Sequence, residues 1–146
     1  MNFLKLLLLA FLIGSLSSCA VEPVPIDYGK DACHFCNMNI VDQQHAAEIV
    51  TDKGKAFKFD ALECMMRDIT KRNEEEIAHF LMTDYLTPGK LVDATKATYL
   101  ISEAIPSPMG ANLTGFESNE KAVETQQEKG GTVYSWDSLK ELFEER

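Results

Sequence analysis

Two cysteines, a histidine and a methionine lie within six residues of one another early in the sequence. Residues 33–38 read Cys-His-Phe-Cys-Asn-Met. Thiolate and thioether sulfur atoms are soft, polarizable donors that suit Cu(I), whereas Zn2+ binds Cys and His readily but makes little use of Met. Met38 therefore favours a copper site over a zinc site, and a methionine that fills the core is the alternative interpretation.

The spacing within this segment suggests a pair of ligands. Cys36 and Met38 are two residues apart, so in an extended segment their side chains point to the same side and can close on one ion. Cys33 is a further candidate ligand, although a Cys33–Cys36 disulfide fits the same spacing. His34 can bind a metal through its imidazole or tune the acidity of the neighbouring thiols, which makes it an accessory candidate.

A second sulfur donor, Met109, lies in a loop that the sequence stiffens. Residues 105–110 read Ile-Pro-Ser-Pro-Met-Gly, in which two prolines restrict the backbone and the glycine permits a tight turn. Such a loop can hold a thioether in place. Two sulfur donors from residues 33–38 and Met109 would form a trigonal site that suits Cu(I), while a methionine that plugs the core is the alternative.

The first residues have the pattern of a bacterial lipoprotein signal. Lys5 precedes an apolar run at 6–13 that is too short to span a bilayer comfortably, and Leu-Ser-Ser-Cys follows at 16–19. This pattern predicts that Cys19 carries the lipid that anchors the protein to a membrane. A signal peptide that is cleaved without lipidation is the alternative.

The same pattern divides the chain into three parts. We expect a signal peptide at 1–18, a lipidated tether with two prolines at 19–30 and one folded domain at 31–146. The anchored domain would face the periplasm. Ala20 follows the lipidated cysteine where an aspartate would signal retention in the inner membrane, so the outer membrane is slightly favoured.

The last cysteine, Cys64, lies on a predicted helix. There it shares a side with Arg67 and Lys71, opposite the apolar stripe, so we expect an exposed thiol that is reactive. The alternatives are a thiol that faces residues 33–38 as an accessory ligand, or one that a shift of one residue in register buries. Once Cys19 is lipidated, the chain keeps three cysteines, which cannot all pair with one another. An odd thiol indicates a ligand or a redox role.

The composition argues against several functional classes. The formal net charge of the 146 residues is −9, and the sequence has no run of Lys and Arg, so no nucleic-acid partner is expected. We find no arrangement of nucleophile, base and acid and no phosphate-binding glycine loop. The sequence thus favours a binding protein over an enzyme.

Hydrophobic periodicity and turn residues predict an α+β fold of two tandem strand–strand–helix–strand units. Asp60 is the expected N-cap of the first helix, and the glycines at 130–131 end the second. His45 and His79 are expected to be structural, and the methionines at 65, 66 and 82 to lie in the core. The predicted strands are 46–51, 55–59, 78–82, 90–93, 98–102 and 132–135, and the predicted helices are 60–73, 117–129 and 136–145.

Taken together, these motifs closely resemble the NosL family of lipid-anchored copper-binding proteins. The resemblance rests on Cys19, on Cys33 to Met38, on Phe59-Asp60 with Cys64-Met65, and on Asp93-Ala94 through Ser107-Pro108-Met109-Gly110 to Phe116. Family members usually have Gly where this chain has Asn37. Asn tolerates left-handed backbone conformations better than most residues, so we expect the loop to be kept.

The resemblance implies a fold related to part of organomercurial lyase and a Cu(I) ion held by Cys36, Met38 and Met109, with Cys33 as a further candidate. It also implies a metallochaperone that takes Cu(I) from a donor or an exporter and delivers it to an apo copper enzyme. The implied client is nitrous oxide reductase or its assembly complex.

Three other functions fit parts of the pattern. A thiol-disulfide oxidoreductase of the envelope would use Cys33 and Cys36, and it would leave the two loop methionines without a role. A purely structural lipoprotein would hold a closed disulfide. An enzyme like organomercurial lyase would need a carboxylate beside two thiols, for which Asp60 with Cys36 and Cys64 is the candidate set.

Overall fold

The computed structural model describes residues 20–145. The expected signal peptide and the expected lipid anchor at Cys19 lie outside the described residues. Within residues 20–145, no helix is both long enough and apolar enough to cross a membrane.

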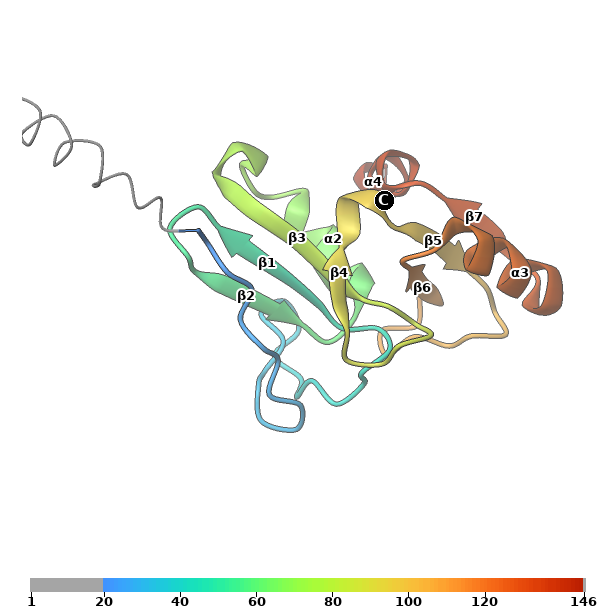
Figure 1. The fold of residues 1–146 in the computed structure, drawn as a ribbon, viewed down its shortest axis with the longest axis horizontal. Helices are drawn as coiled ribbons and strands as arrows, with labels where there is room; N and C mark the ends of the chain where they lie inside the picture. The colour runs from blue at the N-terminus through green and yellow to red at the C-terminus, as the bar shows by residue number, and fades with distance from the viewer. Residues whose placement is uncertain (1–19, 146) are drawn as a thin grey trace, which may run out of the picture.

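The first unit is a strand–strand–helix–strand arrangement built on an antiparallel sheet (Figure 1). Its elements are β1 (Ala47–Thr51), β2 (Ala56–Phe59), α2 (Leu62–Ile69), the 3-10 helix η1 (Glu74–Glu76) and β3 (Ile77–Thr83). The sheet order is β2-β1-β3-β4, in which β4 is Leu91–Asp93. Ala47 and Ile49 belong to the core, because alternate residues of a strand share one face of the sheet.

The second unit also has a strand–strand–helix–strand arrangement, on a smaller antiparallel sheet. In this sheet β5 (Thr98–Ile101) lies between β6 (Leu113–Phe116) and β7 (Thr132–Tyr134). Its elements are the 3-10 helix η2 (Ala94–Lys96), β5 (Thr98–Ile101), β6 (Leu113–Phe116), α3 (Asn119–Lys129), β7 (Thr132–Tyr134) and α4 (Trp136–Glu144). Ser118 caps α3 through the N–H of Lys121, and Gly130, with a φ of 71°, ends it. The prediction of two tandem units and of a glycine helix stop is thus confirmed.

Two strands of the second unit differ from the prediction. The segment predicted at 90–93 was expected to open the second unit, but β4 (Leu91–Asp93) pairs with β3 and completes the first sheet. The second hairpin is formed by β5 and β6 instead. Strand β6 is absent from the predicted strands, because its four residues are too few to show clear periodicity and include Gly115.

Helix α2 also departs from the prediction. It ends at Ile69 rather than near residue 73, and its N-cap is Ala61, with no side-chain cap, rather than Asp60. Cys64 was expected to be exposed and is fully buried. The reason is that α2 contacts β1, β2, β6 and α4, so packing covers more of its surface than a helical wheel predicts.

The two units share one core. Trp136 of α4 packs its ring against Phe80 of β3 and Tyr99 of β5, at centroid distances of 5.3 and 6.2 Å. The methionines at 65, 66 and 82 are buried in this core, as predicted. Gly115 of β6 lies so close to Met82 that an added Cβ would sit 2.0 Å from the methionine sulfur.

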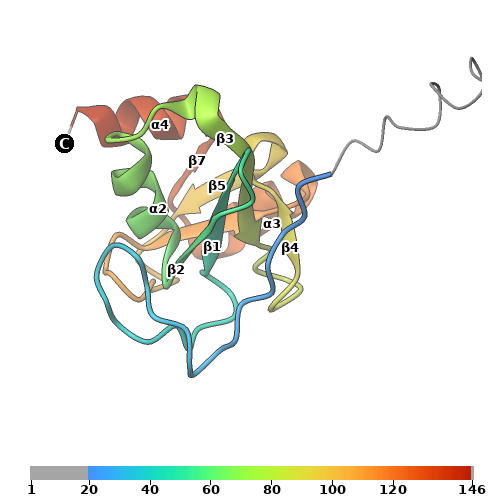
Figure 2. The same ribbon diagram turned by 90° about the vertical axis from the view of Figure 1, so that its left-hand side faces the viewer.

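The segment before β1 lies against the first sheet (Figure 2). The N–H of Val24 donates to Glu48 Oε1 at 2.8 Å, and His79 Nε2 lies 2.8 Å from the carbonyl oxygen of Val21. Ile26 is part of the hydrophobic core. His79 is therefore structural, as expected, and it helps to fix this segment to the sheet.

Candidate metal-binding site

Three thiols from two parts of the chain meet at one end of the first unit. The sulfur atoms of Cys33, Cys36 and Cys64 all lie within 4.8 Å of one another. All three cysteines are free. Cys33 and Cys36 belong to the loop before β1, while Cys64 comes from the first turn of α2. A disulfide between Cys33 and Cys36, which the spacing allowed, is not formed in this structure.

A tight loop holds the first two thiols. Ala32 and Asn39 form an antiparallel bridge, and inside it the N–H of Cys33 donates to the carbonyl of Met38 at 2.8 Å. Asn37 turns the chain with a φ of 62°, a left-handed conformation that Asn tolerates, as predicted. The segment is therefore a turn, and the expectation of an extended Cys36–Met38 stretch is wrong.

Hydrogen bonds to its sulfur favour the thiolate of Cys33. The Cys64 thiol, together with backbone groups of Phe35, Cys36 and Asp60, lowers the pKa of Cys33 to about 5 despite its burial. Cys64 is the donor in this pair, so its own pKa is strongly raised. The pKa of Cys36 is raised mainly by burial. The cluster thus holds one thiolate and two thiols, and a bound cation could replace the thiol protons.

Asp60 forms a hydrogen bond with the segment that follows this loop and does not cap α2. Its carboxylate accepts a hydrogen bond from the backbone of Val41, while its Oδ1 has no partner among the described residues. Burial, followed by the charge of Cys33, raises the pKa of Asp60. A carboxyl group therefore lies close to the thiols, as the organomercurial-lyase alternative required.

The two methionines of the predicted site differ in burial, and neither is as deeply buried as Cys33 or Cys64. Met38 is 53% exposed at the rim of the loop, whereas Met109 is half-buried and packs against the core. Gly110 has a φ of 76°, which confirms the predicted tight turn after Met109.

Glu63 ties the Met109 loop to α2, a role that the sequence analysis missed. Its Oε1 accepts hydrogen bonds from Ser107 Oγ at 2.5 Å and from the N–H of Ala111 at 3.3 Å. Glu63 is fully buried and is the residue before Cys64, so one turn of α2 fixes both a thiol and the loop. Periodicity gave no sign of this role, because a glutamate on a helix is usually solvated.

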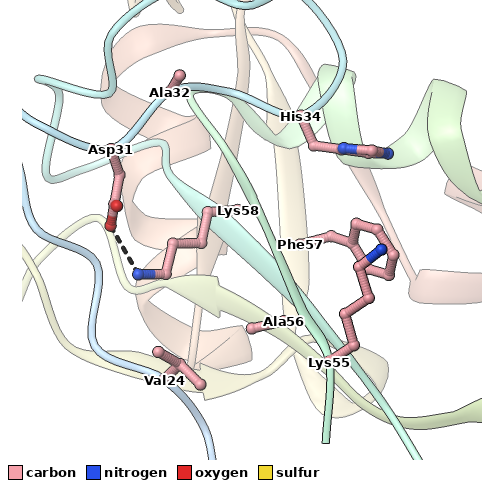
Figure 3. A pocket seen from close by; sticks show the side chains of 8 residues that line it. All are labelled: Val24, Asp31, Ala32, His34, Lys55, Ala56, Phe57 and Lys58. Carbon is pink, nitrogen blue, oxygen red and sulfur yellow. Dashed lines mark hydrogen bonds and ion pairs between the residues drawn. The ribbon is translucent and has the colours of Figure 1, made fainter. Parts of the chain in front are cut away.

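His34 turns away from the thiols. Its ring lies 4.6 Å from the ring of Phe57 and lines an open groove of about 530 Å3 (Figure 3). It is not part of the thiol group, so the structure does not bring this accessory candidate to the sulfur atoms.

A second arrangement of polar groups is structural. His45 Nδ1 lies 3.1 Å from Asp42 Oδ2, and its Nε2 lies 3.3 Å from Thr114 Oγ1. The order of groups resembles a catalytic relay, but Thr114 is fully buried and cannot meet a substrate. His45 is therefore a satisfied core histidine, as expected.

Comparisons with known proteins agree with this fold. A family model described as NosL matches residues 23–143. The structure is similar to the crystal structure of the copper chaperone NosL from Shewanella denitrificans, with a TM-score of 0.70 and 17% sequence identity. The match covers 81% of this chain and 95% of that chain. No curated protein matches the sequence.

Proposed function

This chain belongs to the NosL family, and from that premise we propose that it binds Cu(I) and carries it to a copper enzyme of the cell envelope. The observation that carries the proposal is the group of three free thiols within 4.8 Å. Soft thiolates select Cu(I) over the harder divalent ions. The similar copper chaperone from Shewanella denitrificans supports the same function.

The proposed ligands are Cys33, Cys36, Met38 and Met109, with Cys64 as a further donor at the floor of the site. Cys33 and Cys64 are almost fully buried, while Cys36 is half-buried and Met38 is exposed. The depth of the donors increases from Met38 to Cys64. Cu(I) would therefore enter and leave on the Met38 side.

Transfer would proceed by ligand exchange without a covalent intermediate. A donor from the partner adds to the ion on its exposed side before Met38 departs, so free Cu(I) never forms. The thioethers keep the affinity low enough for release, and the thiols keep it high enough for specificity. No step requires a catalytic residue.

The cellular setting is part of the proposal. The lipobox at 16–19 supports a lipid anchor on Cys19, attachment to a membrane facing the periplasm and, in the simplest sorting rule, the outer membrane. The family resemblance supports nitrous oxide reductase or its assembly complex as the acceptor and a copper exporter or carrier as the donor.

Thiol-disulfide exchange is the second candidate function. The pKa of Cys33 near 5 is the observation that favours it, because the thiolate is the attacking species. However, Cys33 is only 1% exposed, so a disulfide of a partner protein would not reach its sulfur without opening the loop.

An anaerobic Cu(I) titration against a chromophoric chelator, on the full chain in neutral detergent, tests the proposal. We expect one tightly bound Cu(I) per chain, a loss of roughly tenfold or more in affinity for Met38→Ala and for Met109→Ala, and a larger loss for Cys36→Ser. Leu86→Ala is the matched control for Met38, since Leu86 is 51% exposed and lies outside the site. Zn2+ binding of equal strength, or Cu(I) binding that ignores both methionines, would contradict the proposal.

A further inference from the structure

Positive charge is concentrated in one segment of this acidic chain. Residues 53–72 contain six of the 14 Lys and Arg residues, although the formal net charge is −9. The three acidic residues of the segment, Asp60, Glu63 and Asp68, are buried, and Asp68 is paired with Arg72. The exposed surface of this segment is therefore cationic.

Two aromatic rings bring this charge to the thiol loop. Lys55 Nζ and Arg72 Cζ lie 4.6 and 3.9 Å from the ring centre of Phe57, the ring on which His34 also packs. Lys71 Nζ lies 5.1 Å from the ring centre of Phe35. His34 and Phe35 are the two residues between Cys33 and Cys36. Cationic groups therefore lie beside the loop of residues 33–38.

Phe57 and Phe35 each line an open groove. His34, Lys55, Phe57 and Lys58 line the groove of about 530 Å3 in Figure 3, where Lys58 pairs with Asp31. A second groove of about 350 Å3 is lined by Phe35, Arg67, Thr70, Lys71 and Phe143.

Several of these cations lack an intramolecular counter-charge. Within residues 20–145, no carboxylate lies within 4.0 Å of the charged groups of Lys53, Lys55, Arg67 or Lys71. Stacking on Phe57 and Phe35 restrains two of them without neutralising them. Their charge is free to act on a partner.

We propose that this cationic surface, formed by Lys55, Arg67 and Lys71 around Phe35 and Phe57, docks the acidic rim of the protein that exchanges Cu(I) with the thiol loop. The inference rests on the proposed copper-carrier function and specifies its partner. Opposite charges steer two proteins into encounter and fix their mutual orientation. Here they would bring the acceptor ligands to the exposed side of the site.

An acidic protein fits this surface better than an anionic membrane. The cations of this surface lie beside the loop from which Cu(I) would leave, and only a protein partner could take the ion there.

Copper transfer to two synthetic acceptor peptides tests the inference. Both peptides carry the same methionine-rich Cu(I) motif and a reporter tryptophan, and they differ only in having glutamate or lysine flanks. The full chain, loaded with Cu(I) in neutral detergent, is mixed with each peptide, and the tryptophan emission gives the transfer rate. The test variant is Lys55→Glu with Lys71→Glu, and the control of equal net charge is Lys121→Glu with Lys129→Glu on α3.

We expect transfer to the glutamate peptide to be faster by about tenfold or more at low salt. This advantage should disappear near 1 M salt, where the Debye length is about 3 Å. The test variant should invert the preference and the α3 control should keep it. Equal rates for the two peptides, or an equal effect of the two double variants, would overturn the inference.

Two further measurements distinguish docking to a protein from binding to a membrane and from failure of the proposed copper-carrier function. Micelles doped with phosphatidylglycerol should leave the rate of Cu(I) transfer unchanged. If these micelles slow transfer by the wild-type chain but not by the Lys55→Glu, Lys71→Glu variant, the surface binds a membrane and the inference is overturned. If the wild-type chain binds Cu(I) but transfer is insensitive to charge, only the docking surface is refuted. If the wild-type chain fails to bind Cu(I), the proposed function fails and the docking surface fails with it.

Discussion

At the scale of the residue, the thiol cluster is an arrangement of unequal sulfur atoms. Cys33 is the hydrogen-bond acceptor of the group, Cys64 is its donor, and Cys36 lies nearest to solvent. The hydrogen bonds to Cys33 favour its thiolate before any ion arrives. A soft cation would therefore displace protons mainly from the other two sulfur atoms.

Cys64→Ala should change the acidity of Cys33. Without the thiol that donates to it, the Cys33 pKa should rise from about 5 toward the ordinary value of 9.0, held back in part by the remaining backbone hydrogen bonds. Thiolate absorbance at 240 nm, followed in the apo protein as pH increases, measures this shift. Met38→Ala, which removes no hydrogen bond to the sulfur, is the control. An unchanged midpoint near pH 5 in Cys64→Ala would show that Cys64 is not the donor.

Single residues were predictable from sequence to different degrees. The soft-donor chemistry of residues 33–38, the left-handed Asn37 and the turn at Gly110 follow from residue type alone. The burial of Cys64 does not, because a helical wheel assumes one broad solvent face, whereas α2 contacts β1, β2, β6 and α4. The contribution of Cys64 to the cluster therefore depends on tertiary packing.

At the scale of the element, α2 organises the whole site. Its first turn supplies Cys64, and Glu63 beside it holds the loop of Met109 through Ser107 and Ala111. A buried glutamate with two hydrogen bonds to one loop fixes that loop more firmly than apolar contact alone, because breaking the bonds would leave buried polar groups unpaired.

Glu63→Ala should release the Met109 loop. We expect Cu(I) affinity to fall to the level of Met109→Ala, with a loss of stability of about 1–3 kcal/mol from the groups left unpaired. The double variant Glu63→Ala, Met109→Ala should bind no more weakly than either single variant, because both remove the same ligand. Chelator competition and urea unfolding measure the two quantities. Glu63→Gln keeps an acceptor oxygen and is the control, whereas additive losses in the double variant would refute the positioning role.

The elements themselves could be read from sequence where they are long or bounded by turn residues. The hairpin of β1 and β2, helix α3 and its glycine stop follow from periodicity and turn chemistry. The pairing of β4 with β3 and the existence of β6 do not, because strands of three and four residues carry almost no periodic signal. Their places are decided by which partner strand has an open edge.

At the scale of the whole molecule, the site depends on how closely the two units approach each other. Helix α2 of the first unit packs on β6 of the second, and β3 lies against β6 as well. Gly115 permits this approach, since a methyl group there would meet Met82 Sδ at 2.0 Å and Leu62 Cδ1 at 3.2 Å.

Gly115→Ala should separate the units and destabilise the protein by about 1–3 kcal/mol, the usual cost of overpacking a core. Urea unfolding measures the change. Met82→Ala added to Gly115→Ala should recover part of the loss compared with the sum of the two single variants, because it removes the atoms that the new methyl group would meet. An unchanged unfolding midpoint for Gly115→Ala would mean that the core accommodates the methyl group without loss of stability, and it would contradict this prediction.

The N-terminal segment joins the molecule through a buried carboxylate. Glu48 Oε1 accepts the N–H of Val24, its Oε2 has no partner among the described residues, and burial raises its pKa above the usual 4.5. The folded state thus favours the neutral form more than the unfolded state does. Its contribution to stability is fully present below pH 4.5 and is lost as pH rises through the folded pKa.

Glu48→Gln should therefore have a pH-dependent effect. The variant keeps an oxygen to accept the N–H of Val24 and carries no charge at any pH, so its unfolding midpoint should match wild type below pH 4.5 and exceed it at about pH 8. Urea unfolding at both pH values measures the gap. Glu76→Gln on the exposed η1 should leave the midpoint unchanged at both. A gap of constant size would trace the effect to lost packing, whereas a gap that opens with pH shows that the ionised Glu48 weakens the attachment of the segment to the sheet.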